Sequence, residues 1–246
     1  MLARLIAFCA LLAAPRTEPP DALFSVSAAG IPCRVIRVNL ADPRVRVSVQ
    51  TASGCPSGAE PFSTLLARSH PTIAINGAYF SKETLKPIGD IVCGGRVVTK
   101  GMMGTALALT RDNEALIRRV KWGHAEDWSP YETVLSCGPA LVLDGRVDVQ
   151  PEAEGFHDPH VMGSTRRMGV GITADHHLLI VNTLSPATFG KLAEVMRALG
   201  CRDAMNLDAG ASMAMYYRGR TLASPGRNLT NLLTVHVATT AVESMR

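Results

Sequence analysis

The sequence predicts an α+β fold: a large, mostly antiparallel, twisted sheet system with few helices, in a single domain. Two observations lead to this prediction. Short apolar runs follow one another along the chain, and turns of hairpin type, such as CGGR, LDGR and TADHH, separate many of them. Helical spacing is confined to two stretches. Because strands joined by short turns pair antiparallel, and few helices are left to cover the sheets, the pattern is typical of α+β domains.

The N-terminal segment has the layout of a secretory leader. Residues 1–14 have an early arginine, an apolar run and small residues at the end. The run is too short for a permanent anchor, and no later segment offers the ~20 apolar residues of a spanning helix. We expect residues 1–14 to be a signal peptide, the polar, Pro-rich 15–30 a linker, and 31–246 one domain. The mature protein is then secreted or periplasmic, with no integral membrane segment.

Strands are expected wherever a short run of aliphatic and β-branched residues lies between turns. These runs are 33–40, 45–50, 72–80, 90–99, 105–110, 116–122, 139–147, 167–173, 177–183, 204–210, 212–219 and 231–238. Helices are expected at 61–69 and 185–200. In the second helix, Ser185 is expected to cap the N-terminus, Pro186 to occupy the first turn and Gly200 to end it.

Composition excludes several functions. The 246-residue chain is 47% hydrophobic, which is ample for a packed core, and its net charge of +4 is thinly spread. No stretch interleaves basic and aromatic residues as a nucleic-acid face does, so no nucleic-acid partner is expected. The six cysteines form no C-x-x-C pair and have no histidine at zinc-finger spacing. We therefore expect neither a metal nor a cofactor, and the oligomeric state stays open.

Polar residues interrupt the apolar pattern at four places. They are Asn76, Gly77 and Tyr79; Arg167; Asn206, Asp208, Gly210 and Ser212; and Arg227 and Asn231. Buried polar groups cost free energy unless they are paired or used. Each place also has a local explanation, since Asn-Gly and Asx residues are common in turns and an arginine can be a surface charge. Two glycines after Arg167 would let a ligand approach the backbone closely.

Six segments in order carry a family resemblance: AINGAYF, KPIGDIVCGGRVVT, CGPALVLDGR, RRMGVGIT, MNLDAGAS and RNLTNLLTV. Together they resemble the successive sequence blocks of the phosphodiester glycosidase family over roughly 35–237. The resemblance implies an exported hydrolase that cleaves sugar 1-phosphodiester bonds in a phosphorylated carbohydrate, on cell-envelope or extracellular glycans. Three alanines, Ala78, Ala209 and Ala211, stand where the family prefers glycine. A positive φ at these positions would strain alanine by roughly 1 kcal/mol.

Carried over position by position, the resemblance implies the roles of the polar residues. Asp208, Arg167 and Asn206 are the expected catalytic residues, with Asp208 as the carboxylate that serves the sugar carbon. The expected substrate-binding residues are Asn76, Gly77, Tyr79, Gly210, Ser212, Arg227 and Asn231. Asp90, Asp158 and Asp203 are candidates for a second acid, and nothing in the sequence selects one.

Two other functions are compatible with these residues. GASMA around Ser212 approaches the nucleophile elbow of serine hydrolases, although that elbow needs a helix after the serine and a strand is expected here. A non-catalytic glycan-binding protein could keep the same pocket without turnover. Arg166 and Arg167 distinguish these two hypotheses from phosphodiester cleavage, in which Arg167 would bind the phosphate of the substrate. If Arg167 enters the site, Arg166 should point to the opposite face.

Overall fold

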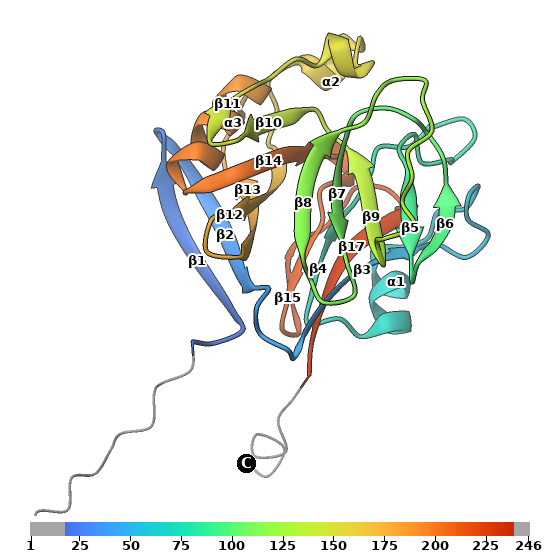
Figure 1. Cartoon of the computed structure of the whole chain (residues 1–246), viewed down its shortest axis with the longest axis horizontal. Coiled ribbons are helices and arrows are strands. Elements are labelled where there is room, and N and C mark those ends of the chain that lie inside the picture. Colours follow the sequence, from blue (N-terminus) through green and yellow to red (C-terminus); the bar gives the residue numbers. More distant parts are fainter. Residues whose placement is uncertain (1–17, 239–246) are drawn as a thin grey trace, which may run out of the picture.

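A computed structural model of the chain describes residues 18–238, which form three antiparallel sheets and few helices (Figure 1). The seven-stranded sheet has the order β1-β2-β13-β12-β14-β10-β11, and the two five-stranded sheets have the orders β16-β15-β4-β17-β3 and β6-β5-β9-β7-β8. This architecture confirms the predicted α+β class. None of the helices in this range is long and apolar enough to cross a membrane.

The bounds of the elements are as follows. The seven-stranded sheet contains β1 (Asp21–Ala28), β2 (Ile31–Asn39), β10 (Ala140–Leu143), β11 (Arg146–Val147), β12 (Met168–Thr173), β13 (His177–Thr183) and β14 (Cys201–Leu207). The second sheet contains β3 (Val45–Thr51), β4 (Ile73–Asn76), β15 (Met215–Tyr217), β16 (Arg220–Ala223) and β17 (Asn231–Val237). The third contains β5 (Ile91–Cys93), β6 (Arg96–Thr99), β7 (Thr105–Leu109), β8 (Ala115–Arg119) and β9 (Thr133–Cys137). The helices are α1 (Phe62–Ser69), α2 (Pro159–Met162) and α3 (Phe189–Ala198), with 3-10 turns η1 (Glu152–Glu154) and η2 (Gly210–Ser212).

The seven-stranded sheet is covered on both faces, which explains its nearly continuous apolar strands. Successive residues of β2 alternate between the two faces: Val35 packs in the cluster under α3, and Ile36 packs in the central core. That core draws residues from all three sheets, including Ile75 of the second and Leu107 of the third. The strand ends that carry the polar residues therefore rest on a single packed core.

Three expectations about the elements need correction. Residues 21–28 are not part of a linker, because they form β1 and pair along their whole length with β2. Strand β9, Thr133–Cys137, had not been expected, because its mixed Thr, Ser and Cys content hides a fully buried strand. Helix α3 begins at Phe189, and the cap is Thr188, whose side chain accepts the Lys191 N–H, rather than Ser185. The expected signal peptide at 1–14 lies outside the described residues.

Candidate active site

The site forms where strand ends of two different sheets meet. Asn76 ends β4 of the second sheet, and Asp208 follows β14 of the seven-stranded sheet. The Asn76 side-chain N–H donates to the backbone carbonyl of Asp208, and its Oδ1 accepts the Ala214 N–H at 2.9 Å. The Asp208 N–H in turn donates to the Gly77 carbonyl at 3.2 Å. Asn76 is buried and therefore ties the Asp208 loop to the end of β4.

Asn231 at the start of β17 holds the next turn of the same wall. Its Oδ1 accepts the Ala78 N–H at 2.7 Å, and its carbonyl accepts the Gly77 N–H at 3.2 Å. A Cβ at Gly77 would lie only 2.0 Å from this Oδ1. Gly77 is therefore explained by the close approach of Asn231, and the local alternative of an Asn-Gly hairpin turn does not apply, since Gly77 has no positive φ.

Asn206 positions Tyr79. The Asn206 side chain is fully buried, and its Nδ2 donates to the Tyr79 hydroxyl at 2.8 Å and to the Gly138 carbonyl at 3.2 Å. Its Oδ1 is buried with no hydrogen-bond partner among the described residues. Burial raises the pKa of the Tyr79 phenol well above its usual value, so this hydroxyl stays protonated. A buried amide thus fixes a neutral hydroxyl donor in the cavity wall.

Arg167 is buried, and Arg166 beside it is exposed, as expected for neighbours that face opposite ways. The Arg167 guanidinium donates to the carbonyls of Ala187, at 3.1 Å, Val161, at 2.9 Å, and Gly163. It also stacks 3.9 Å from the centre of the Phe189 ring. Desolvation lowers the pKa of this arginine, and the nearby Tyr79 opposes that shift. Arg167 therefore organises the α2 segment at the cavity edge.

The glycines after Arg167 serve packing rather than ligand approach. A Cβ at Gly169 would lie 3.3 Å from atoms of Leu192 and Met196, both on α3, and one at Gly171 would lie 2.5 Å from the sulfur of Cys201. These glycines let α3 lie close against β12. The expectation that they admit a ligand was wrong, because the helix already fills that space.

A cavity of about 780 Å³ opens beside Asp208. The sequence-predicted residues that line it are Tyr79, Arg167, Asp208, Gly210 and Arg227. Burial raises the pKa of the Asp208 carboxyl from 3.8 to about 6, while Ser212, the Ala209 N–H, Arg227 and Lys82 act in the opposite direction. The Ala209 N–H donates to this carboxylate at 2.7 Å. Asp208 is thus a partly buried carboxylate in contact with a ligand-sized space.

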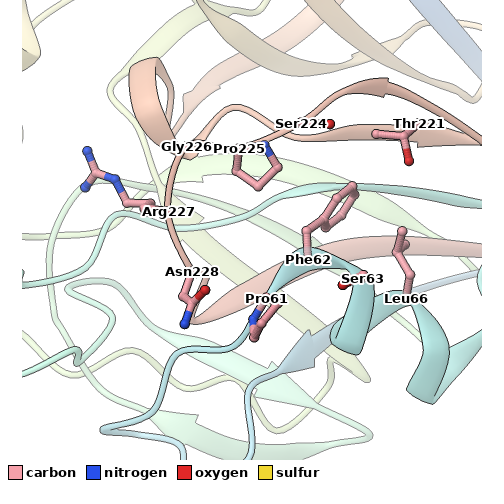
Figure 2. Close-up of a pocket in the computed structure, with 10 residues that line it drawn as sticks. All are labelled: Pro61, Phe62, Ser63, Leu66, Thr221, Ser224, Pro225, Gly226, Arg227 and Asn228. Atoms are coloured by element: carbon pink, nitrogen blue, oxygen red, sulfur yellow. The ribbon is translucent and has the colours of Figure 1, made fainter.

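Arg227 and Lys82 add two exposed positive charges to the cavity, beside the buried Arg167. Both are exposed, and the Arg227 guanidinium lies 5.9 Å from the centre of the Phe80 ring. Arg227 also borders a second hollow of about 430 Å³ between the start of α1 and the loop at 224–228. Figure 2 shows the Arg227 guanidinium extending away from Phe62 and Leu66 of that hollow. The side chain is free of the backbone carbonyls that occupy Arg167, so it can bind an anion.

The backbone conformation of the loop after Asp208 accounts for Gly210 and is compatible with Ala209 and Ala211. Gly210 has a positive φ of 59°, whereas Ala78, Ala209 and Ala211 do not have a positive φ. The three alanines therefore do not carry the backbone strain that a positive φ would cause. Ser212 is fully buried, its hydroxyl has no hydrogen-bond partner of ordinary geometry in the described part of the chain, and strand β15 follows it. Neither its burial nor its setting suits a serine nucleophile.

The structure also brings in residues that sequence reasoning had not assigned to the site. Of the three candidate second acids, Asp158 lines the cavity, together with Glu83, His157 and His160. Asp90 instead accepts the Trp128 indole N–H at 2.7 Å, and Asp203 accepts the Asp144 N–H at 2.9 Å. Within residues 18–238, no group of three or more His, Cys, Asp or Glu side chains could hold a metal ion.

The site thus combines one partly buried carboxylate, a neutral phenol and cationic side chains around a ligand-sized cavity, an arrangement that can bind an anionic ligand. The family model of the phosphodiester glycosidases matches residues 69–238. The chain belongs to the phosphodiester glycosidase family, as the six sequence segments had indicated.

Solved structures support the fold. The catalytic domain of zebrafish N-acetylglucosamine-1-phosphodiester alpha-N-acetylglucosaminidase, auto-inhibited by its pro-peptide, is 17% identical with a TM-score of 0.70, and the match covers 91% of this chain and 85% of that one. A hypothetical protein from Synechocystis is 15% identical with a TM-score of 0.68, over 90% of this chain and 64% of that one. This chain thus spans less than two thirds of the Synechocystis protein. No curated protein sequence matches it.

Proposed function

We propose that this enzyme hydrolyses the bond between the anomeric carbon and the phosphate of a sugar 1-phosphodiester, with Asp208 as the catalytic carboxylate. The observation that carries the proposal is the position of Asp208: a carboxyl whose pKa is about 6 faces a ligand-sized cavity that also holds Arg227 and Lys82. The proposed natural substrates are phosphorylated glycans of the cell envelope or the extracellular space.

The two signs of charge in the cavity match the two charges of the reaction. As the bond to phosphate breaks, positive charge grows on the sugar ring and negative charge grows on the departing phosphate monoester. Asp208 supplies negative charge for the ring, and Arg227 and Lys82 supply positive charge for the leaving group. Water adds to the anomeric carbon, and the electron pair of the broken bond stays on the phosphate oxygen. Since the phosphate monoester is already stable as an anion, stabilising its negative charge contributes more to catalysis than protonating it.

The remaining cavity residues complete the assignment. The Tyr79 hydroxyl, fixed by Asn206, can donate to a sugar or phosphate oxygen while the phenol stays neutral. Asp158 is the favoured second acid among the three candidates, because it alone of them lines the cavity. Arg167 was expected to be catalytic and Asn76 and Asn231 to bind substrate. Because Arg167 is bonded to three backbone carbonyls at the cavity edge and both asparagines are bonded to neighbouring backbone, we propose instead that all three act mainly through the loops that they hold. Gly77 and Gly210 provide backbone shape, and Ser212 lies against the Asp208 carboxyl and lowers its pKa.

Turnover on a small panel tests the proposal: the methyl diester of N-acetylglucosamine 1-phosphate, nucleoside diphosphate sugars and teichoic-acid-like fragments. We expect release of free sugar and of the phosphate-bearing product by the wild type, and a loss of both with Asp208→Asn. Glycan binding without any release over long incubation would favour the non-catalytic alternative. Labelling of Ser212 by a fluorophosphonate would restore the serine hydrolase, which its burial otherwise disfavours.

We also propose that the protein is exported and that the leader is removed near Ala13 or Ala14. The short apolar run followed by small residues supports this, and these residues lie outside the described range. Intact-mass measurement of the protein from its native host checks the claim. A mature chain that still begins at Met1 would contradict it.

A further inference from the structure

One aromatic side chain near the cavity has no structural explanation. Trp122 is 61% exposed, which makes it the most exposed large hydrophobic residue between residues 18 and 238. The other tryptophan, Trp128, is buried at 3% exposure and bonded to Asp90. An exposed indole loses the benefit of burying one of the largest apolar side chains, so a single exposed tryptophan calls for a partner more than an exposed valine does.

Trp122 lies at the rim of the proposed active site. A Cβ at Gly155 would come within 3.7 Å of the indole Nε1 and Cε2, and Gly155 lines the cavity. The indole and the His157 ring have their centres 6.4 Å apart, and His157 also lines the cavity. The loop that carries Trp122 is pinned, because the Gly123 N–H donates to the Met102 carbonyl at 3.0 Å. The indole is therefore held in place beside the cavity.

Asp208 lines the cavity, whereas Trp122 lies beside it, next to Gly155 and His157. The rings of Tyr79 and Phe156, whose centres lie 5.7 Å apart, also line the cavity, and Phe156 directly precedes His157. The cavity volume of about 780 Å³ lies in the upper part of the range of small-molecule pockets, which leaves room for more than one sugar ring.

We propose that Trp122 is a binding platform for a second sugar ring, so that the substrate carries one ring at Asp208 and another at the rim. This inference rests on the proposed function and extends it to the size of the substrate. The apolar C–H face of a sugar ring can cover an exposed indole while the sugar hydroxyls stay in water, and Nε1 can donate a hydrogen bond. The second ring belongs either to the glycan on the released sugar or to the alcohol beyond the phosphate.

Kinetics on three probes test the proposal and separate the two sources. They are the methyl diester of N-acetylglucosamine 1-phosphate, the diester in which glucose O6 replaces methanol, and the methyl diester of chitobiose 1-phosphate. We expect Trp122→Ala to lower kcat/KM roughly tenfold on one of the two-ring probes and to change it less than twofold on the one-ring probe. The affected probe identifies the source of the second ring. Trp122→Phe should retain most of the activity.

The matched control is Phe24→Ala, which removes another exposed aromatic, 41% exposed, from β1. It should leave all three probes unaffected. Equal losses with Trp122→Ala on all three probes, or no loss on either two-ring probe, would overturn the proposal. A wild type that turns over none of the panel would count against the proposed function and leave the binding measurement to decide the role of Trp122.

Fluorescence gives that measurement without turnover. In an Asp208→Asn background, a bound sugar ring should shift the emission of the exposed Trp122 to shorter wavelength, whereas the buried Trp128 stays constant. We expect a saturable shift with one two-ring probe and none with the one-ring probe, and its disappearance in the double variant with Trp122→Phe. A shift that survives Trp122→Phe, or no shift with either two-ring probe, would contradict the platform.

Discussion

The polar residues of the site divide into a buried frame and an accessible face. Asn76, Asn206 and Asn231 are at most 2% exposed, and their amides bond mainly to the backbone and to Tyr79. Asp208 is partly exposed and Arg227 is exposed, and both line the cavity. The sequence segments alone do not separate the two groups. The comparison shows that the sequence alone does not tell a structural polar residue from a functional one. The hydrogen-bond partners in the folded protein make that distinction.

The largest expected effect is on the accessible face. Asp208→Asn keeps the shape of the side chain and removes the charge that the sugar cation needs, so we expect turnover to fall by a factor of hundreds or more. The rate of sugar release measures this, and a melting curve shows that the protein is folded. Equal activity in the variant and the wild type would show that Asp208 has a structural role rather than a catalytic one.

The next largest effects are expected at Arg227 of the accessible face and Arg167 of the buried frame. Arg227→Lys keeps the charge but loses the planar fork, so we expect kcat/KM to fall by roughly 30-fold, about 2 kcal/mol, at an unchanged Tm. Arg167→Lys also removes donors from three backbone carbonyls, so both Tm and kcat/KM should fall. Arg166→Lys, at an exposed position, is the control and should change neither. A drop in Tm with Arg227→Lys alone would reverse the assignment of the two arginines.

A change confined to the frame should act on stability. In Gly77→Ala the new methyl would meet Asn231 Oδ1 at 2.0 Å, so the bond from the Ala78 N–H must break. We expect the free energy of unfolding to fall by roughly 2 kcal/mol, measured by urea denaturation. Gly190→Ala, at an exposed position of α3, is the matched control and should be neutral or slightly stabilising. A stable Gly77→Ala protein would show that the frame tolerates movement.

The smallest expected effect is the stability cost of the catalytic carboxylate. Because the folded-state pKa of Asp208 is about 6 and its ordinary value is 3.8, the ionised form is disfavoured in the folded protein. The cost is absent below pH 3.8, grows as the pH rises to 6, and is complete above pH 6. A rise of this size corresponds to roughly 3 kcal/mol at full strength, and solvent screening at this partly exposed side chain reduces it. We therefore expect Asp208→Asn to be more stable than the wild type by roughly 1–2 kcal/mol at pH 7.5, with the gain vanishing near pH 4. Urea denaturation at both pH values checks this, and a gain that is independent of pH would be inconsistent with ionisation as its cause.

Much of the fold follows from local pattern, because alternation and turn chemistry are local. The hairpin of β12 and β13 around TADHH is one example. Strands β1 and β9 were missed because their pairing partners, rather than their composition, make them strands. Thr188 rather than Ser185 caps α3, because Ala187 forms a β-bridge with Thr165 and Thr188 is still extended, so the helix can begin only at Phe189. Tertiary pairing decided each of these cases.

The site was predictable as a set of positions and not as a set of roles. Asp208 was recognisable as a carboxylate after an apolar strand. That Asn206 serves Tyr79, and that the glycines after Arg167 serve α3, depends on contacts between distant segments. Asp158, Glu83 and the two histidines carry no pattern that places them at the cavity. Trp122 had been read only as the end of a strand, because exposure and neighbourhood are not visible in sequence.

The hydrogen bonds of the buried frame also determine when, during synthesis and folding, the enzyme can become active. Asn76 and Asp208 are joined across 132 positions, and Ala78 and Asn231 across 153. Contacts between such distant segments close late, since the chain must first pay the entropy of a long loop. A ribosome that has released the chain only as far as Asp208 has therefore released a polypeptide that has the carboxylate but lacks β17, whose Asn231 holds the loop at Gly77 and Ala78. We therefore expect the enzyme to stay inactive during its own synthesis and to become active only after β17 has been released and has paired.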